Sequence, residues 1–424
     1  MEYKIFSQKS YNIHTIKTDR FKVGRIEVFF RFEANAKKLP ILSFLSGIMS
    51  DSSKDYPTQR KLAIQKENLY KCFYYSSLVR VGNVSSLMFS LDFINPSLIN
   101  EKSYIDELIK FLFDMIKKPN VKNNEFDLEA FNIEKNDILL DIESINEDPV
   151  KMAINNALNV MDASSISSAL KLGTKDDILK ITRESLYDEY KYVISNSMVD
   201  IFVIGSLDMD KIVSLIKDNY HNIRINNYEF NYYVNNKLRK KALIKSDTSS
   251  FGQSQLTIIY NLVNLNQYEK EIVFPVFNYI FGSGGLTSKL YKYLREENGL
   301  CYRVSSMHFK YDNLLCILVS LGKDNILKAI KLCDKALKEM CKKGFTENDL
   351  NDAKKNLKLS LEMNKNNEIT LLNSIVFTSF TNSYSIDEKL CKIENVSVSD
   401  ITSVAKKIKI NTIYSLCEGE NGKN

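Results

Sequence analysis

The stretch FGSGGLTSKLYKYLREENGLCYRVSS, residues 281–306, carries the strongest signals in this chain of 424 residues. Three glycines open it: Gly282, Gly284 and Gly285. An amphipathic helical pattern follows, with Arg295 near its end, Gly299 after its last turn and Tyr302 at the start of an alternating segment. Glycine suits both a tight turn and a helix end, because it adopts positive φ and allows close backbone approach. The pattern predicts one guanidinium and one phenol at a helix–strand junction.

This pair of side chains has two interpretations from the residues alone. Arg295 and Tyr302 are able to hydrogen-bond an extended peptide backbone, or the oxyanion that forms when a peptide bond is attacked. They also fit a helix hairpin with a surface arginine and a half-buried tyrosine. The rest of the chain decides between these interpretations.

Length and composition indicate a folded protein of two or more domains. Hydrophobic residues make up 44% of the chain and charged residues 26%, as in ordinary soluble proteins. The net charge of +6 is spread over the chain without a basic stripe, so we expect no nucleic-acid partner.

The N-terminal residues and the cysteines indicate a cytoplasmic protein. The polar start MEYKIFSQKSYNIHTIK lacks the apolar segment of a signal peptide, and no apolar run is long enough for a membrane span. The seven cysteines are an odd number without the CxxC spacing, which predicts reduced thiols.

The chain contains an internal duplication. KENLYKCFYYSSLVR near residue 70 resembles EENGLCYRVSSMHF near residue 300, and aligning Ser76 with Ser305 gives an offset of 229. Each copy predicts a strand, two helices, two strands, long helices and a final helix with a strand. We therefore predict an α+β fold of two tandem homologous domains, each an antiparallel sheet covered by helices. The predicted domains are residues 1–221 and 246–424, with a linker at 222–245.

At residue level, the second copy resembles the pitrilysin/insulinase-type zinc peptidases, in particular their short, bacterial, processing-peptidase-like branch. The resemblance covers nearly the whole chain and is most specific in GSGGLTSKLYKYLREENGLCY. It implies half of a clam-like chamber. It also implies that Arg295 and Tyr302 hold a peptide substrate and stabilise the tetrahedral intermediate, with Gly282, Gly284 and Gly285 at the substrate.

The zinc half of that family's site is missing from this chain. Active members carry His-x-x-Glu-His on a helix of the first domain, where both histidines bind zinc and the glutamate is the general base. The matching positions here are Ser43, Ser46 and Gly47, before SSKDYPT, and the distal ligand would fall near Asp141. We therefore expect no metal cofactor in this chain.

Asp141 also belongs to an acidic cluster with Glu143, Glu147 and Asp148. This cluster fits a solvated helix end, with a vestigial ligand shell as the alternative. The only histidines are His14, His221 and His308, far apart in the sequence.

The resemblance implies two functions of different classes. The first is a non-catalytic, substrate-binding subunit of a heterodimeric zinc metallopeptidase, in which a zinc-bearing homologue faces Arg295 and Tyr302. Its substrates would be peptides, for example leader peptides of modified peptides, and the chain alone would have no peptidase activity. The second is a degenerate homologue that acts as a scaffold or binding module, for example in elongation factor P modification.

Overall fold

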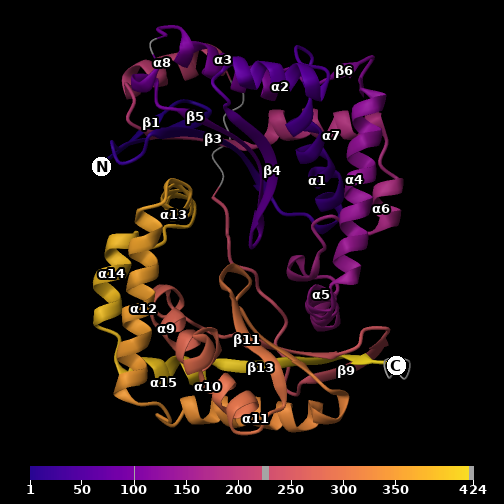
Figure 1. The fold of residues 1–424 in the computed structure, drawn as a ribbon, viewed down its shortest axis with the longest axis vertical. Helices are drawn as coiled ribbons and strands as arrows, with labels where there is room; N and C mark the ends of the chain where they lie inside the picture. Colours follow the sequence, from indigo (N-terminus) through magenta and orange to yellow (C-terminus); the bar gives the residue numbers. More distant parts are fainter. Residues whose placement is uncertain (100, 222–228, 420–424) are drawn as a thin grey trace. The chain divides into compact units, whose positions relative to one another are not determined.

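The computed structural model describes residues 1–99, 101–221 and 229–419. Contacts divide the chain into two compact units (Figure 1): Met1–Ser144 with Leu170–Tyr232, and Ile145–Ala169 with Tyr233–Asn424. The predicted domain boundaries differ from this division, because residues 145–169 group by contact with the second unit. Residues 222–228 of the predicted linker lie outside the described residues.

The first unit is built on a six-stranded sheet of order β1-β2-β8-β3-β5-β4. Its strands are β1 (Glu2–Ser7), β2 (Tyr11–Lys17), β3 (Val23–Glu33), β4 (Phe73–Val81), β5 (Val84–Ile94) and β8 (Met198–Gly205). Neighbouring strands pair antiparallel except β2 and β8, which pair parallel. The short strands β6 (Val121–Lys122) and β7 (Glu125–Phe126) form a separate ribbon.

The helices of this unit supply apolar faces to the core. They are α1 (Leu39–Asp51), α2 (Gln59–Asn68), α3 (Tyr104–Lys117), α4 (Leu128–Glu147), α6 (Lys175–Leu179), α7 (Arg183–Asn196) and α8 (Met209–Asn219). On α3, for example, Leu108, Leu112 and Ile116 are fully buried. The spacing of these residues by four places them on one helix face.

The two faces of strand β3 bury different side chains: one face is apolar and the other carries charged groups. Ile26, Val28 and Phe30 are fully buried on one face, as alternation predicts. The other face carries buried charges, among them Arg31, whose Nε donates to Asp200 Oδ2 at 2.9 Å. His14 Nε2 lies 3.2 Å from the other Asp200 oxygen. This network satisfies the polar groups that the strand would otherwise leave unpaired.

The second unit repeats the sheet of the first. Its order is β11-β12-β10-β13-β9. The strands are β9 (Leu243–Ser249), β10 (Ser254–Leu262), β11 (Cys301–Phe309), β12 (Leu314–Leu321) and β13 (Ile408–Glu418). Reading both sheets in sequence order gives the same arrangement, with β1 added to the first, so the predicted duplication is confirmed. The pair β9–β13 is parallel, whereas a purely antiparallel sheet was expected.

Helices cover both faces of this sheet. The repeated helices are α9 (Phe274–Asn278), α10 (Lys289–Tyr291), α11 (Ile326–Met340), α12 (Glu347–Lys365), α13 (Glu368–Thr381), α14 (Ile386–Glu394) and α15 (Val398–Lys406). Helix α5 (Pro149–Asp162) packs Ala153, Ala157 and Met161 against a smaller cluster that includes Ile259 and Tyr414. Small alanines at a spacing of four let α5 lie close to the strands. Within the described residues, no helix is both long and apolar enough to cross a membrane.

Candidate functional site

The helical segment before β11 contains three π-helical turns. These are η4 (Glu269–Val273), η5 (Tyr279–Ser283) and η7 (Lys292–Glu296). The sequence predicted ordinary helices in this part of the second copy. A π turn inserts an extra residue into the helical repeat and is frequent at functional sites. Here the last one, η7, contains Arg295.

The glycines of the turn have mainly packing roles. A Cβ on Gly282 would lie 2.5 Å from Ser306 Oγ and 2.6 Å from Leu290 Cδ1, so only glycine allows β11 to approach this closely. Gly285 has φ of +64°, which favours glycine. The structure places Gly282 in the core, and the predicted substrate contact of Gly282, Gly284 and Gly285 stays a prediction.

Arg295 and Tyr302 come together at the end of this segment, as the sequence predicted. Arg295 Nη1 donates to the Tyr302 carbonyl oxygen at 3.0 Å. Its guanidinium lies 4.6 Å from the centre of the Tyr302 ring and 5.1 Å from that of Tyr291. Arginine stacks well on aromatic faces, so the two rings hold the guanidinium in one position. Tyr291 is a further ring contact of Arg295 that was not predicted from the sequence, although its spacing of four from Arg295 could have revealed it.

Tyr302 lies in a β-bulge at the start of β11. Cys301 pairs with Leu321 and Arg303 with Ser320, so Tyr302 has no partner residue in the ladder. Bulges turn a side chain out of the regular alternation and are common next to active sites. Tyr302 is 78% exposed, and no hydrogen bond of its hydroxyl is found within the described part of the chain. It is therefore available to a bound molecule.

Ser43, Ser46 and Gly47, the positions that the resemblance matches to the zinc motif, lie on α1, and the two serines have structural partners. Ser43 Oγ donates to the Lys171 carbonyl at 2.7 Å, and Ser46 Oγ donates to the Ser43 carbonyl at 2.7 Å. Gly47 offers no side chain. Hydroxyls engaged in this way do not provide the imidazole and carboxylate ligands that zinc requires. The residues present do not fit a zinc ion.

Glu134 of α4 fills the space that a side chain at position 47 would occupy. A Cβ on Gly47 would lie 1.7 Å from Glu134 Oε1. Burial, followed by the nearby Asp51, Asp137 and Asp141, raises the pKa of Glu134 to about 8. Glu134 is thus mostly protonated at neutral pH. Glu134 was not predicted from the sequence, because only the packing of α4 on α1 brings it to Gly47.

Asp141 itself lies on the exposed surface of α4, two turns beyond Glu134. Glu143 and Glu147 are exposed too, and Asp148 caps α5 by accepting from the backbone N–H of Val150 and Lys151. These positions fit the solvated helix end. Within residues 1–99, 101–221 and 229–419, no group of three or more His, Cys, Asp or Glu side chains could hold a metal ion.

Comparisons with known proteins agree with this arrangement. Residues 180–357 match the family model described as "Peptidase M16 inactive domain". The probable inactive metalloprotease YmfF of Bacillus subtilis is 22% identical over 409 residues, covering 95% of each chain.

Two solved structures show the same fold. A conserved protein from Enterococcus faecalis superposes with a TM-score of 0.91 at 23% identity, over 100% of this chain and 99% of that one. The peptidase M16 inactive domain from Pseudomonas fluorescens gives a TM-score of 0.78 at 16% identity, over 99% of each chain. Residues 180–357 thus carry the peptidase M16 inactive domain, and the chain as a whole is similar, over nearly its full length, to the inactive branch of the pitrilysin-like zinc peptidases.

Proposed function

We propose that this non-catalytic homologue is the substrate-binding subunit of a heterodimeric zinc metallopeptidase. The observation that carries the proposal is the contrast between its two half-sites. The Arg295 guanidinium contacts the rings of Tyr291 and the exposed Tyr302. In contrast, α1 carries two serines and Gly47, and the Glu134 side chain occupies the space beside Gly47. A chain that keeps the substrate-binding residues but has no metal site can take part in cleavage when a second chain provides the metal.

The chemistry of this half-site suits a peptide under attack. One of the five N–H donors of Arg295 bonds the Tyr302 carbonyl, and the remaining donors suit a substrate carbonyl. The Tyr302 hydroxyl suits the oxyanion that develops in the tetrahedral intermediate. Donors that are positioned in advance stabilise such a charge without reorganisation during the reaction. In the proposed complex, the partner subunit provides the zinc and the general base, and the two subunits enclose a chamber.

Peptides are the proposed substrates because the site opens onto a sheet edge. Strand β11 stands at the end of the strand order and begins with Cys301, next to Tyr302. An extended peptide added to this edge would run past the Tyr302 side chain. Leader peptides of modified peptides are one example. We further propose a cytoplasmic location, supported by five of the seven cysteines being buried as small core side chains.

The experiment is co-expression with a homologue that carries His-x-x-Glu-His, followed by size-exclusion chromatography and peptide cleavage assays. We expect a heterodimer with an interface of roughly 2,000 Å² or more. In that complex, Arg295→Ala and Tyr302→Phe should each slow cleavage by about 10²–10³-fold, the typical effect of losing one oxyanion donor. Zinc content should not change.

Two matched controls separate catalysis from folding. Arg303→Ala removes a neighbouring exposed arginine of β11, and Tyr192→Phe removes a hydroxyl from an exposed tyrosine of α7. Both control complexes should cleave at the wild-type rate. Wild-type rates with Arg295→Ala and Tyr302→Phe would contradict the proposed role, and so would separate monomer peaks at micromolar concentration.

A scaffold role, for example in elongation factor P modification, is the second candidate. It is favoured by the hydrogen bond of Arg295 to the Tyr302 carbonyl, because this bond also serves to fix the bulge of β11. Under this function, Arg295→Ala would lower the stability of the chain and leave cleavage by any complex unchanged. Thermal unfolding of the isolated variant, read beside the cleavage assay, distinguishes the two functions.

A further inference from the structure

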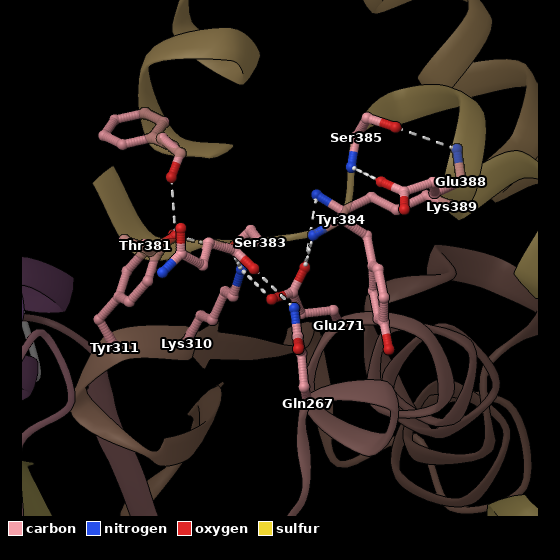
Figure 2. Close-up of polar contacts among 12 residues, drawn as sticks. Gln267, Glu271, Lys310, Tyr311, Thr381, Ser383, Tyr384, Ser385, Glu388 and Lys389 are labelled. Atoms are coloured by element: carbon pink, nitrogen blue, oxygen red, sulfur yellow. Dashed lines mark hydrogen bonds and ion pairs between the residues drawn. The ribbon is translucent and has the colours of Figure 1, made fainter. Parts of the chain in front are cut away.

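A buried carboxylate in the second unit lies near two lysine ammonium groups, and a third lysine is its neighbour in the chain. Glu271 of η4 has a side chain that is only 1% exposed. Lys310 Nζ lies 3.6 Å and Lys389 Nζ 3.9 Å from its oxygens, and the Tyr384 N–H donates to it at 3.0 Å (Figure 2). Lys270 immediately precedes Glu271 in the chain. We call Lys270, Lys310 and Lys389 the lysine cluster.

The lysine cluster has more hydrogen-bond donors than the protein uses. Three ammonium groups offer nine N–H donors. Within the described residues, Lys310 Nζ donates to Ser383 Oγ at 3.1 Å and also interacts with the Glu271 carboxylate. The two distances to Glu271 are too long for good hydrogen bonds. Lys270 Nζ instead lies 3.7 Å from the centre of the Tyr233 ring.

The charge around Glu271 is unbalanced. The neighbouring Glu388 accepts from the Ser385 N–H and has Lys392 beside it, and Glu269 is paired with Lys407. Four lysines, counting Lys392, therefore face two carboxylates, Glu271 and Glu388, which leaves a surplus of two positive charges. Burial and mutual repulsion lower the pKa of Lys270 and Lys389.

The surroundings of the lysine cluster are open to a ligand. The side chains of Lys310 and Lys389 remain 22% and 21% exposed. The hydroxyls of Ser383 and Thr381 lie 2.6 Å apart beside Lys310. Lys270 also lines a cavity of about 460 Å³ whose other walls include Asn261, Leu262, Asn264 and Asn313; Lys310 and Lys389 do not line this cavity.

We propose that the lysine cluster is a binding site for a phosphate group. A phosphate carries a charge of about −1.5 to −2 and three acceptor oxygens, which match the surplus of two positive charges and the unused ammonium donors. Lysine suits phosphate as a point charge. A single carboxylate would leave one charge uncompensated. The site lies on η4, η8 (Lys310–Asp312) and α14, apart from Arg295 and Tyr302 in sequence, and does not depend on the proposed peptidase role.

The test is calorimetric titration of the full chain with inorganic phosphate at constant ionic strength. We expect one saturable site per chain, and acetate should bind at least about tenfold more weakly. The double variant Lys310→Met/Lys389→Met should lose at least about tenfold in phosphate affinity. Glu271→Gln keeps an acceptor for the Tyr384 N–H but removes the competing charge, so it should bind phosphate more tightly. A parallel titration with phosphoserine shows where the phosphate group comes from. If phosphoserine binds more tightly than inorganic phosphate, the site binds an organic phosphate; if it binds more weakly, the site binds free phosphate.

Lys365→Met is the matched control. Lys365 lies in the same unit, is also 22% exposed and is ion-paired with Asp387, so its loss should leave phosphate affinity unchanged. If the double variant does not fold, the single variant Lys389→Gln provides the measurement. The proposal is overturned if the wild type shows no saturable binding at millimolar phosphate, if acetate binds equally well, or if the lysine variants bind like the wild type.

Discussion

Glu134→Gln tests whether the carboxyl that fills the degenerate zinc position is protonated in the folded protein. Glutamine has the same shape and keeps the contact with Gly47, but it cannot ionise. The pKa of Glu134 is about 8 in the folded chain against an ordinary value of 4.5. Burial is the main cause, and Asp51, Asp137 and Asp141 add to it.

The sign of the effect follows from proton binding. Because the pKa is higher in the folded state, the folded chain binds more protons than the unfolded chain between these two values. The free energy of unfolding therefore falls as pH rises through this window. One pKa unit corresponds to about 1.4 kcal/mol, so Glu134 should cost about 3 kcal/mol at pH 7 and about 5 kcal/mol above pH 8, as upper limits. The glutamine variant avoids this cost.

The assay is urea unfolding of wild type and variant, followed by circular dichroism from about pH 5 to about pH 9. The stability gain of Glu134→Gln over wild type should grow by a few kcal/mol across this range and then level off. Glu143→Gln, an exposed position on the same helix, is the control and should follow the wild type. Parallel pH profiles for wild type and Glu134→Gln would refute the assignment of a protonated carboxyl.

Three further predictions concern buried groups. Gly47→Ala should destabilise the wild type, because its Cβ would lie 1.7 Å from Glu134 Oε1, but in a Glu134→Ala background it should stabilise by about 1 kcal/mol through helix propensity; a double-mutant cycle in urea measures both. Asp200→Asn should cost about 3–5 kcal/mol, since it leaves the buried Arg31 without its counter-charge; thermal and urea unfolding would show it, and a loss below about 1 kcal/mol would contradict a dry ion pair. His308 has its pKa lowered to about 3 by burial, with Lys310 as a smaller cause, so the wild type should lose stability as pH falls below about 6.5, whereas His308→Phe should lose less; acid titrations of both proteins would compare them.

The repeated pattern of the chain predicted most of the fold. The same pattern of apolar residues occurs in both halves of the chain, and it predicts two α+β units of the same design. This pattern depends only on which residues face the core. The parallel pairs β2–β8 and β9–β13 were not predicted. Alternation shows that a strand has one covered face, but it does not give the direction of its neighbour.

The sequence by itself determined which residues stand at the positions that the resemblance matches to the site of the zinc peptidases. Arg295 and Tyr302 stand beside a glycine turn, and the resemblance matches Ser43 and Gly47 to the zinc-ligand positions and Ser46 to the general-base position, because residue identity within one helix or one turn is local information. Tertiary structure alone decided the bulge at Tyr302, the placement of Glu134 against Gly47 and the convergence of Lys310 and Lys389 on Glu271. The physical reason is that burial and charge interactions depend on distances between segments far apart in the chain, and no local pattern contains those distances.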